Sequence, residues 1–116
     1  MATSRDRAIQ STQHLLEALG DLRIATRATE TSIRRALKKT ERGGDVSEAL
    51  VALTPSGLRQ SMNVALEAVE KARHEARLTV FAMGLEQGMS IGELGRMFGF
   101  SRQLAARYAK EARGKY

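Results

Sequence analysis

Residues 88–113 read GMSIGELGRMFGFSRQLAARYAKEAR, and this stretch decides the fold of the C-terminal part of the chain. Gly88 can adopt the left-handed conformation that ends a preceding helix. Ser90 and Glu93 have the spacing of a capping box, which predicts a short helix over 91–98. The inward residues of that helix are expected to be Ile91, Leu94 and Phe98, with Gly95 between them, where the missing side chain lets another helix approach closely.

A second helix is predicted over 102–113, after a tight turn. Gly99 readily adopts the positive φ of such a turn, Phe100 can point back into the core, and Ser101 is a typical N-cap. The inward face of this helix is expected to comprise Leu104, Ala105, Tyr108 and Ala112. The outward face is expected to comprise Arg102, Gln103, Ala106, Arg107 and Lys110. A cationic face with an amide, opposite a face of small residues and one tyrosine, is typical of a helix that lies in a DNA groove.

The outward residues match the chemistry of base edges and phosphates. Arginine pairs bidentately with guanine and glutamine with adenine, while the methyl group of Ala106 can meet that of thymine. Lys110 and the later Arg113 are better suited to phosphates, which contribute affinity without sequence preference. The predicted DNA-binding residues are Ser101, Arg102, Gln103, Ala106, Arg107, Lys110 and Arg113.

The stretch SIGELGRMFGFSRQLAARY, residues 90–108, resembles the helix-turn-helix motif of bacterial DNA-binding regulators. The glycine, apolar residue, serine, arginine and glutamine that open its second helix are similar to those of many such domains, including sigma factors and resolvases. The resemblance implies that 102–113 is a recognition helix for the major groove of double-stranded DNA. It extends to about residue 74 if the end of the preceding helix completes a trihelical unit without a wing.

The rest of the chain predicts long helices. A first helix is expected over 5–42, ending at Gly43-Gly44 and kinked near Gly20 if at all. A short helix follows from Asp45 to about Leu53. Thr54-Pro55 supplies an N-cap and a first-turn proline for a helix that runs to Glu86. The stripe expected on the first helix is Leu15, Leu19, Leu22, Thr26, Thr29, Ile33 and Ala36 or Leu37. The stripe expected on the long second helix is Leu58, Met62, Ala65 or Leu66, Val69, Ala72, Ala76, Val80 and Met83.

These elements predict an all-α fold in which a long N-terminal helical hairpin precedes the helix-turn-helix unit. No stretch alternates with a period of two, so strands are not expected. We divide the chain by function into a dimerisation arm, 1–53, and a second part, 54–116, that leads into the helix-turn-helix. Because each long helix buries only one face in a hairpin, the leftover apolar stripe favours a homodimer over a monomer.

Charge and aromatic residues are unevenly distributed. The net charge of +6 is concentrated in 23–42, with seven Lys/Arg against two acids, and in 102–115, with five against one. The first block has two interpretations, a solvated helix face or a second phosphate-binding surface. All five aromatic residues lie beyond residue 80, which predicts an aromatic core behind the second basic block.

Other classes of function are disfavoured by the sequence. Without cysteine there are no disulfides, thiolate metal sites or thiol nucleophiles. His14 and His74 lack partners at metal-ligand spacing, no paired base activates a serine, and no glycine loop cradles phosphates. We therefore expect no enzyme activity, metal, cofactor or small-molecule ligand. Without a signal peptide or an apolar run of about 18 residues, a cytoplasmic, nucleoid-associated protein is expected and membrane binding is not.

The main hypothesis is thus a sequence-specific transcriptional regulator, a homodimer of bacterial type. Two alternatives remain open. One is a sequence-tolerant nucleoid-type DNA binder, whose affinity would depend steeply on salt. The other is a helical protein-interaction module that does not bind DNA.

Overall fold

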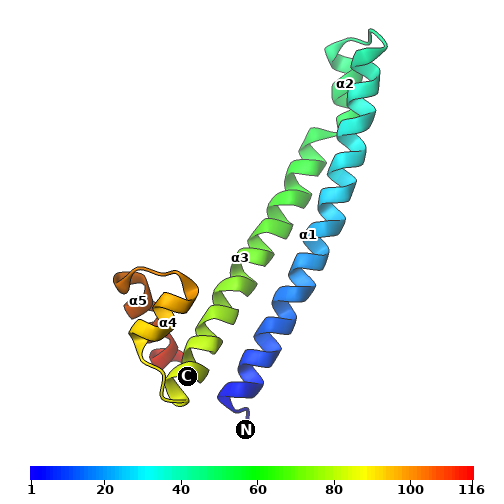
Figure 1. Cartoon of the computed structure of the whole chain (residues 1–116). Helices are drawn as coiled ribbons and strands as arrows, with labels where there is room; N and C mark the ends of the chain where they lie inside the picture. The colour runs from blue at the N-terminus through cyan, green and yellow to red at the C-terminus, as the bar shows by residue number, and fades with distance from the viewer. The chain divides into compact units, whose positions relative to one another are not determined.

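The computed structural model describes all residues, 1–116, and contains five α-helices (Figure 1). The helices are α1 (Ser4–Glu41), α2 (Val46–Leu53), α3 (Pro55–Glu86), α4 (Ile91–Phe98) and α5 (Arg102–Lys115). They account for 86% of the chain and no strand is present, which confirms the all-α class. None of the five helices has the length and apolarity needed to cross a membrane.

Most helix ends lie where the local signals predict them. At the end of α1 the backbone N–H of Gly44 donates to the carbonyl of Lys39 at 2.8 Å, and Gly43 has a φ of 84°. These are the contacts of a Schellman motif, so the double glycine is a stop signal as expected. The Asp45 carboxylate caps α2 by accepting from the backbone N–H of Glu48. α1 is continuous through Gly20.

The junction between α2 and α3 differs from the expectation. Thr54 was predicted to cap α3 with its hydroxyl, but that hydroxyl donates to the carbonyl of Leu53 at 2.8 Å. Thr54 instead ends α2 in the left-handed conformation, with φ 47° and ψ 59°. A threonine seldom adopts this conformation because its branched Cβ crowds the backbone. Pro55 is the first residue of α3, as predicted.

The chain groups into two compact units. One, which we call the aromatic unit, combines residues 1–16 with 71–116; the other, which we call the arm, comprises residues 17–70. The division by function after residue 53 stays a prediction.

The aromatic unit has a core built around stacked rings. Ring centroids of Phe81, Phe98, Phe100 and Tyr108 are 5.0 to 6.1 Å apart in neighbouring pairs. Phe81 is fully buried at the centre of this cluster. The prediction of an aromatic core is therefore confirmed for four of the five rings. Tyr116 follows the end of α5, and its ring lies 5.0 Å from the guanidinium of Arg7 instead.

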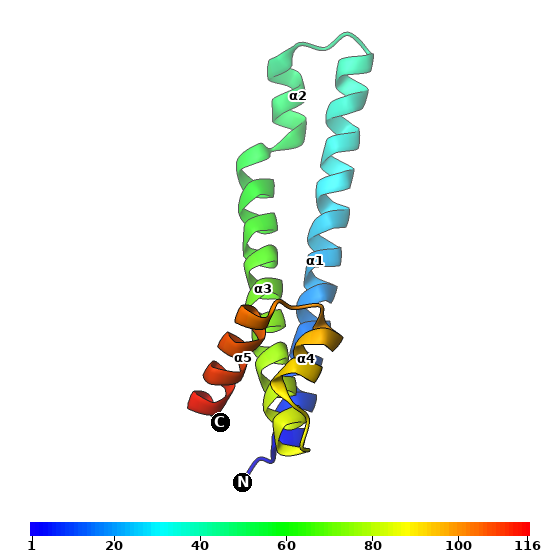
Figure 2. The ribbon, with the colours of Figure 1, turned by 60° about the vertical axis from the view of Figure 1, so that its left-hand side comes forward.

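In the arm, α1 and α3 run side by side in both views (Figures 1 and 2). The expected stripe on α3 is confirmed, because its residues are shielded from solvent. Its members within the arm are Leu58, Met62, Ala65 and Val69. On α1 the shielded positions of the arm are Ala18, Leu22, Ala25, Thr29, Ser32 and Ala36. Within the arm, the predicted α1 stripe is confirmed at Leu22, Thr29 and Ala36. It was wrong at Leu19, Thr26 and Ile33, which are exposed. Spacings of three and four residues fit either of two neighbouring stripes on α1. The shielded stripe contains more small residues, which let α1 lie close to α3.

Candidate nucleic-acid interface

All seven predicted DNA-binding residues are exposed on α5 or at its start. Ser101, Arg102, Gln103, Ala106, Arg107, Lys110 and Arg113 each keep a large part of their surface accessible. At about 100° per residue, the six that lie within the helix share an arc of about 140°. Five basic residues and one acid lie within 102–115. The predicted face is therefore continuous, accessible and cationic.

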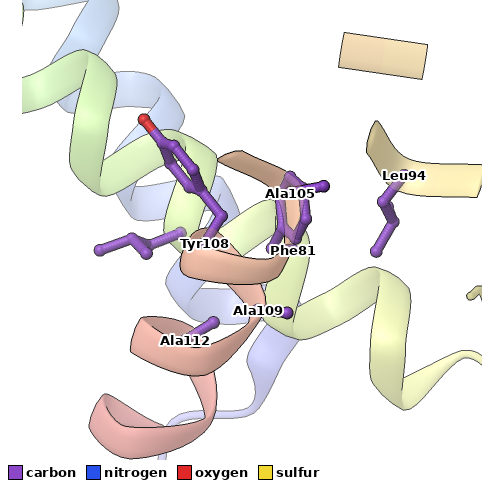
Figure 3. Close-up of a cluster of buried hydrophobic side chains, with 7 residues drawn as sticks. Phe81, Leu94, Ala105, Tyr108, Ala109 and Ala112 are labelled. Carbon is purple, nitrogen blue, oxygen red and sulfur yellow. The ribbon is translucent and has the colours of Figure 1, made fainter. Parts of the chain in front are cut away.

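The opposite face of α5 is buried, which fixes how the helix is turned about its own axis (Figure 3). Ala105, Tyr108 and Ala112 are at most 7% exposed, as expected for the inward face. Ala109 is also fully buried, although it was not among the residues predicted for the inward face. Leu104 is partly buried against the same core. Because the buried face consists mainly of alanines, α5 packs close to its neighbours and its polar face is turned outward.

The turn before α5 holds the helix start in place. Gly99 has a φ of 73° and so takes the left-handed conformation that the tight turn requires. The backbone N–H of Phe100 donates to the carbonyl of Gly95 at 2.8 Å. The Ser101 hydroxyl accepts from the backbone N–H of Leu104 at 3.2 Å. Ser101 is thus the N-cap of α5, and its hydroxyl hydrogen is still free to be donated to a ligand.

The helix α4 is fixed by the same kind of local contact. Ser90 and Glu93 form the predicted capping box, with both reciprocal hydrogen bonds present. Leu94 is buried, while Ile91 and Phe98 pack partly buried against the core. The expected inward face of α4 is therefore confirmed.

A polar cluster that sequence reasoning missed links α5 to α3. His74 Nδ1 lies 3.1 Å from the Tyr108 hydroxyl, and Nε2 lies 3.1 Å from both carboxylate oxygens of Glu111. A proton on Nε2 satisfies both contacts, because Nε2 then donates to Glu111 while Nδ1 accepts from the tyrosine. Local spacing could not predict these contacts, because Tyr108 and Glu111 are 34 and 37 residues away from His74 in sequence. His14 is exposed.

Glu75 provides a second link at the end of α5. Its carboxylate accepts from Lys115 Nζ at 2.7 Å and from the hydroxyl of Tyr116. Partial burial would raise the pKa of Glu75, but the hydrogen bonds from Lys115 and Tyr116 outweigh it and the pKa is lowered. Burial and the contact with Glu75 raise the pKa of Tyr116 to about 12. These contacts occupy one of the five basic residues of 102–115, and Arg102, Arg107, Lys110 and Arg113 remain on the exposed face.

One further cation, Arg77, lies next to the turn before α5, and one of the seven predicted residues, Arg113, lies at the far end of the helix. The guanidinium of Arg77, on α3, lies 5.2 Å from the ring centroid of Phe100, directly before the start of α5. Arg77 was not among the predicted site residues. It lies one helical turn before Phe81 on α3, and the ring of Phe81 packs against that of Phe100. This spacing is the sequence signal that could have pointed to Arg77. Arg113 lies at the far end of α5, where it borders a cavity of about 120 Å³ together with Arg7, Glu86 and Tyr116. It is about 16 Å along the helix from Arg102, at 1.5 Å per residue.

Among residues 1–116, no group of three or more His, Asp or Glu side chains gathers to hold a metal ion. No protein-family model, no curated protein and no solved structure matches this chain.

Proposed function

We propose that the chain is a sequence-specific DNA-binding transcriptional regulator in which α4 and α5 act as a helix-turn-helix. In this proposal residues 102–113 enter the major groove as the recognition helix. The observation that carries the proposal is the division of α5 into two faces. Three alanine side chains and one tyrosine side chain anchor one face of α5 in the core. Arginine, lysine and glutamine side chains are exposed on the other face. A rigidly anchored helix with an exposed cationic face suits the major groove, which is wide enough to admit it.

We divide the roles of the exposed residues by their chemistry. Arg102, Gln103, Ala106 and Arg107 read base edges, whereas Lys110 and Arg113 contact phosphates. Ser101 donates its free hydroxyl hydrogen to a phosphate near the start of α5. Such a DNA partner would bring the chain to the nucleoid of the bacterial cytoplasm.

We further propose that the regulator is a homodimer and that residues 1–53, the segment predicted from the sequence, make the dimer contacts. Two copies related by a two-fold axis display two recognition helices. They would favour inverted half-sites separated by about 34 Å, one turn of DNA.

Selection from random duplex DNA tests this proposal. The chain is immobilised, bound duplexes are amplified and sequenced, and the winning duplex is titrated at two salt concentrations. Recovery of an inverted repeat supports the regulator. The matched variants are Arg107→Ala, which should lose discrimination between the winning and a scrambled duplex, and Arg59→Ala, an exposed arginine on α3 in the arm, which should keep it.

The outcomes separate the proposal from its rivals. Equal affinity for all duplexes together with a steep fall in affinity with salt would instead indicate a nucleoid-type binder. Failure to retain any duplex at low salt would exclude DNA binding and leave a protein-interaction module.

A further inference from the structure

The arm fully buries few apolar side chains and leaves many large ones exposed. Among residues 17–70, only Ala18 and Ala65 are less than 9% exposed. The large aliphatic residues that the arm leaves exposed are Leu19, Ile24, Ile33, Leu37, Val46, Leu50, Val51, Val64 and Leu66. So few fully buried side chains offset only a small part of the conformational entropy lost when a unit of this size is ordered. The exposed apolar surface therefore needs a cover.

One flank of α1 carries a regular stripe of exposed residues with an apolar residue at each end, which we call the flank stripe. It consists of Leu19, Arg23, Thr26, Glu30 and Ile33, with alternating spacings of four and three residues. That spacing keeps the five side chains on one line along the helix. Leu19 is 42% exposed and Ile33 is 52% exposed, so both ends of the stripe are apolar and accessible.

The apolar ends of the flank stripe are placed symmetrically about its central residue, Thr26. Leu19 and Ile33 each lie seven residues from Thr26, on opposite sides of it. When two α1 helices cross antiparallel at Thr26, Leu19 of each copy meets Ile33 of the other. The Thr26 hydroxyl donates to the carbonyl of Leu22 at 2.8 Å, so its polar group is already satisfied within the helix. Thr26 therefore presents its methyl group at the crossing point and can be buried there at little cost.

The charges of the flank stripe favour the antiparallel orientation. Arg23 precedes Thr26 by three residues and Glu30 follows it by four. Antiparallel pairing brings the guanidinium of each copy close to the carboxylate of the other, whereas parallel pairing places Arg23 next to Arg23 and Glu30 next to Glu30. Glu30 also accepts from Arg34 of its own helix at 3.2 Å, and its second oxygen is available to the partner. The stripe thus complements a copy of itself in one orientation.

We propose that a second copy of this chain covers the flank stripe, with the two α1 helices antiparallel and crossing at Thr26. This inference rests on the homodimer of the proposed function and specifies its interface. It does not depend on DNA binding.

Cysteine cross-linking tests the position of the interface, because the chain has no cysteine of its own. Under mild oxidation Thr26→Cys should form a disulfide between two copies, since residue 26 lies on the two-fold axis. The control is Ala28→Cys, because Ala28 lines a separate groove of about 570 Å³ together with Ile24 and Val64. Cross-linking of Ala28→Cys but not of Thr26→Cys would place the interface in that groove and overturn the inference.

Mixed cross-linking tests the orientation. A tagged Leu19→Cys chain mixed with an untagged Ile33→Cys chain should give a disulfide between the two variants. Disulfides within the Leu19→Cys population alone would indicate parallel helices and would contradict the inference.

A mass measurement without DNA separates this inference from the rest of the proposed function. Ile33→Glu should raise the dissociation constant of the dimer by about 100-fold, since each dimer buries Ile33 twice. Ile24→Glu, at an exposed position that borders the groove, should leave it unchanged, and circular dichroism checks that both variants keep their helices. A monomer mass at high protein concentration would overturn both the inference and the proposed homodimer. A dimer that retains no duplex would overturn only the DNA-binding function.

Discussion

Gly95 of α4 lies directly against Ala105 of α5. A β-carbon at Gly95 would lie 2.8 Å from the β-carbon of Ala105, closer than carbon atoms pack. Only the hydrogen of glycine fits at this contact, and the orientation of the exposed face of α5 depends on it.

Gly95→Ala should therefore destabilise the aromatic unit. The added methyl group forces α4 and α5 apart, and such overpacking costs about 1 to 3 kcal/mol of the free energy of unfolding. Urea denaturation followed by circular dichroism measures the change. The second substitution in Gly95→Ala/Ala105→Gly removes the opposing methyl group and should restore part of the loss.

Gly92→Ala is the matched control in the same helix. A β-carbon at Gly92 would be no closer than 3.4 Å to a neighbour, and that neighbour is the flexible end of Arg96. Since alanine favours helix over glycine by about 1 kcal/mol, this variant should be as stable as the original chain or more stable. Equal effects of the two substitutions would mean that the close contact with Ala105 does not limit the packing.

Thr54→Gly should stabilise the arm. Thr54 has a φ of 47°, where a branched side chain is strained by about 1 to 2 kcal/mol and glycine is not. Part of this gain is lost because glycine makes the unfolded chain more flexible, so a net increase of up to about 1 kcal/mol is expected. The same change at Thr31, an exposed position inside α1, should lower stability because glycine disfavours helix there. Denaturation midpoints of the two variants should thus move in opposite directions.

Tyr116 should make the aromatic unit sensitive to alkaline pH. Its pKa rises from 10.0 to about 12 in the folded chain. A group whose pKa is higher in the folded chain than in the unfolded chain stabilises the fold fully at pH values below its unfolded pKa. This stabilisation is lost as the pH rises through the folded pKa. The free energy of unfolding should therefore fall between about pH 10 and pH 12, and the fall should be smaller in Tyr116→Phe. Tyrosinate absorbance, with Tyr108 as the only tyrosine left in the variant, follows the titration. A titration of Tyr116 at its ordinary pKa would contradict the contact with Glu75.

Local signals made most of the fold predictable. Ser90, Glu93 and Gly99 act within a few residues of themselves, so the boundaries of α4 and α5 follow from their spacing. Contacts over long sequence separation were not predictable in this way. The pairing of His74 with Tyr108 and Glu111 depends on how α5 packs against α3. The choice of Ala18 and Ala25 over Leu19 and Thr26 as the shielded stripe of α1 also depends on packing, because both stripes have the same spacing. The exposed face of α5 was predictable from its sequence, while its role in DNA binding is still a prediction.

Arg107 and Lys110 should have different effects on DNA binding, although both are exposed cations on α5. An arginine that pairs bidentately with guanine discriminates against other bases by about 1 to 3 kcal/mol. Arg107→Ala should therefore weaken binding to the selected duplex by about 10- to 100-fold and bind a scrambled duplex nearly as before.

A lysine that contacts a phosphate acts on every sequence alike. Lys110→Ala should weaken binding to both duplexes by similar factors and reduce the slope of log affinity against log salt by about one. Titrations of both duplexes at several salt concentrations distinguish these patterns. Identical behaviour of the two variants would mean that α5 contacts only the phosphate backbone, and the sequence-specific part of the proposal would be wrong.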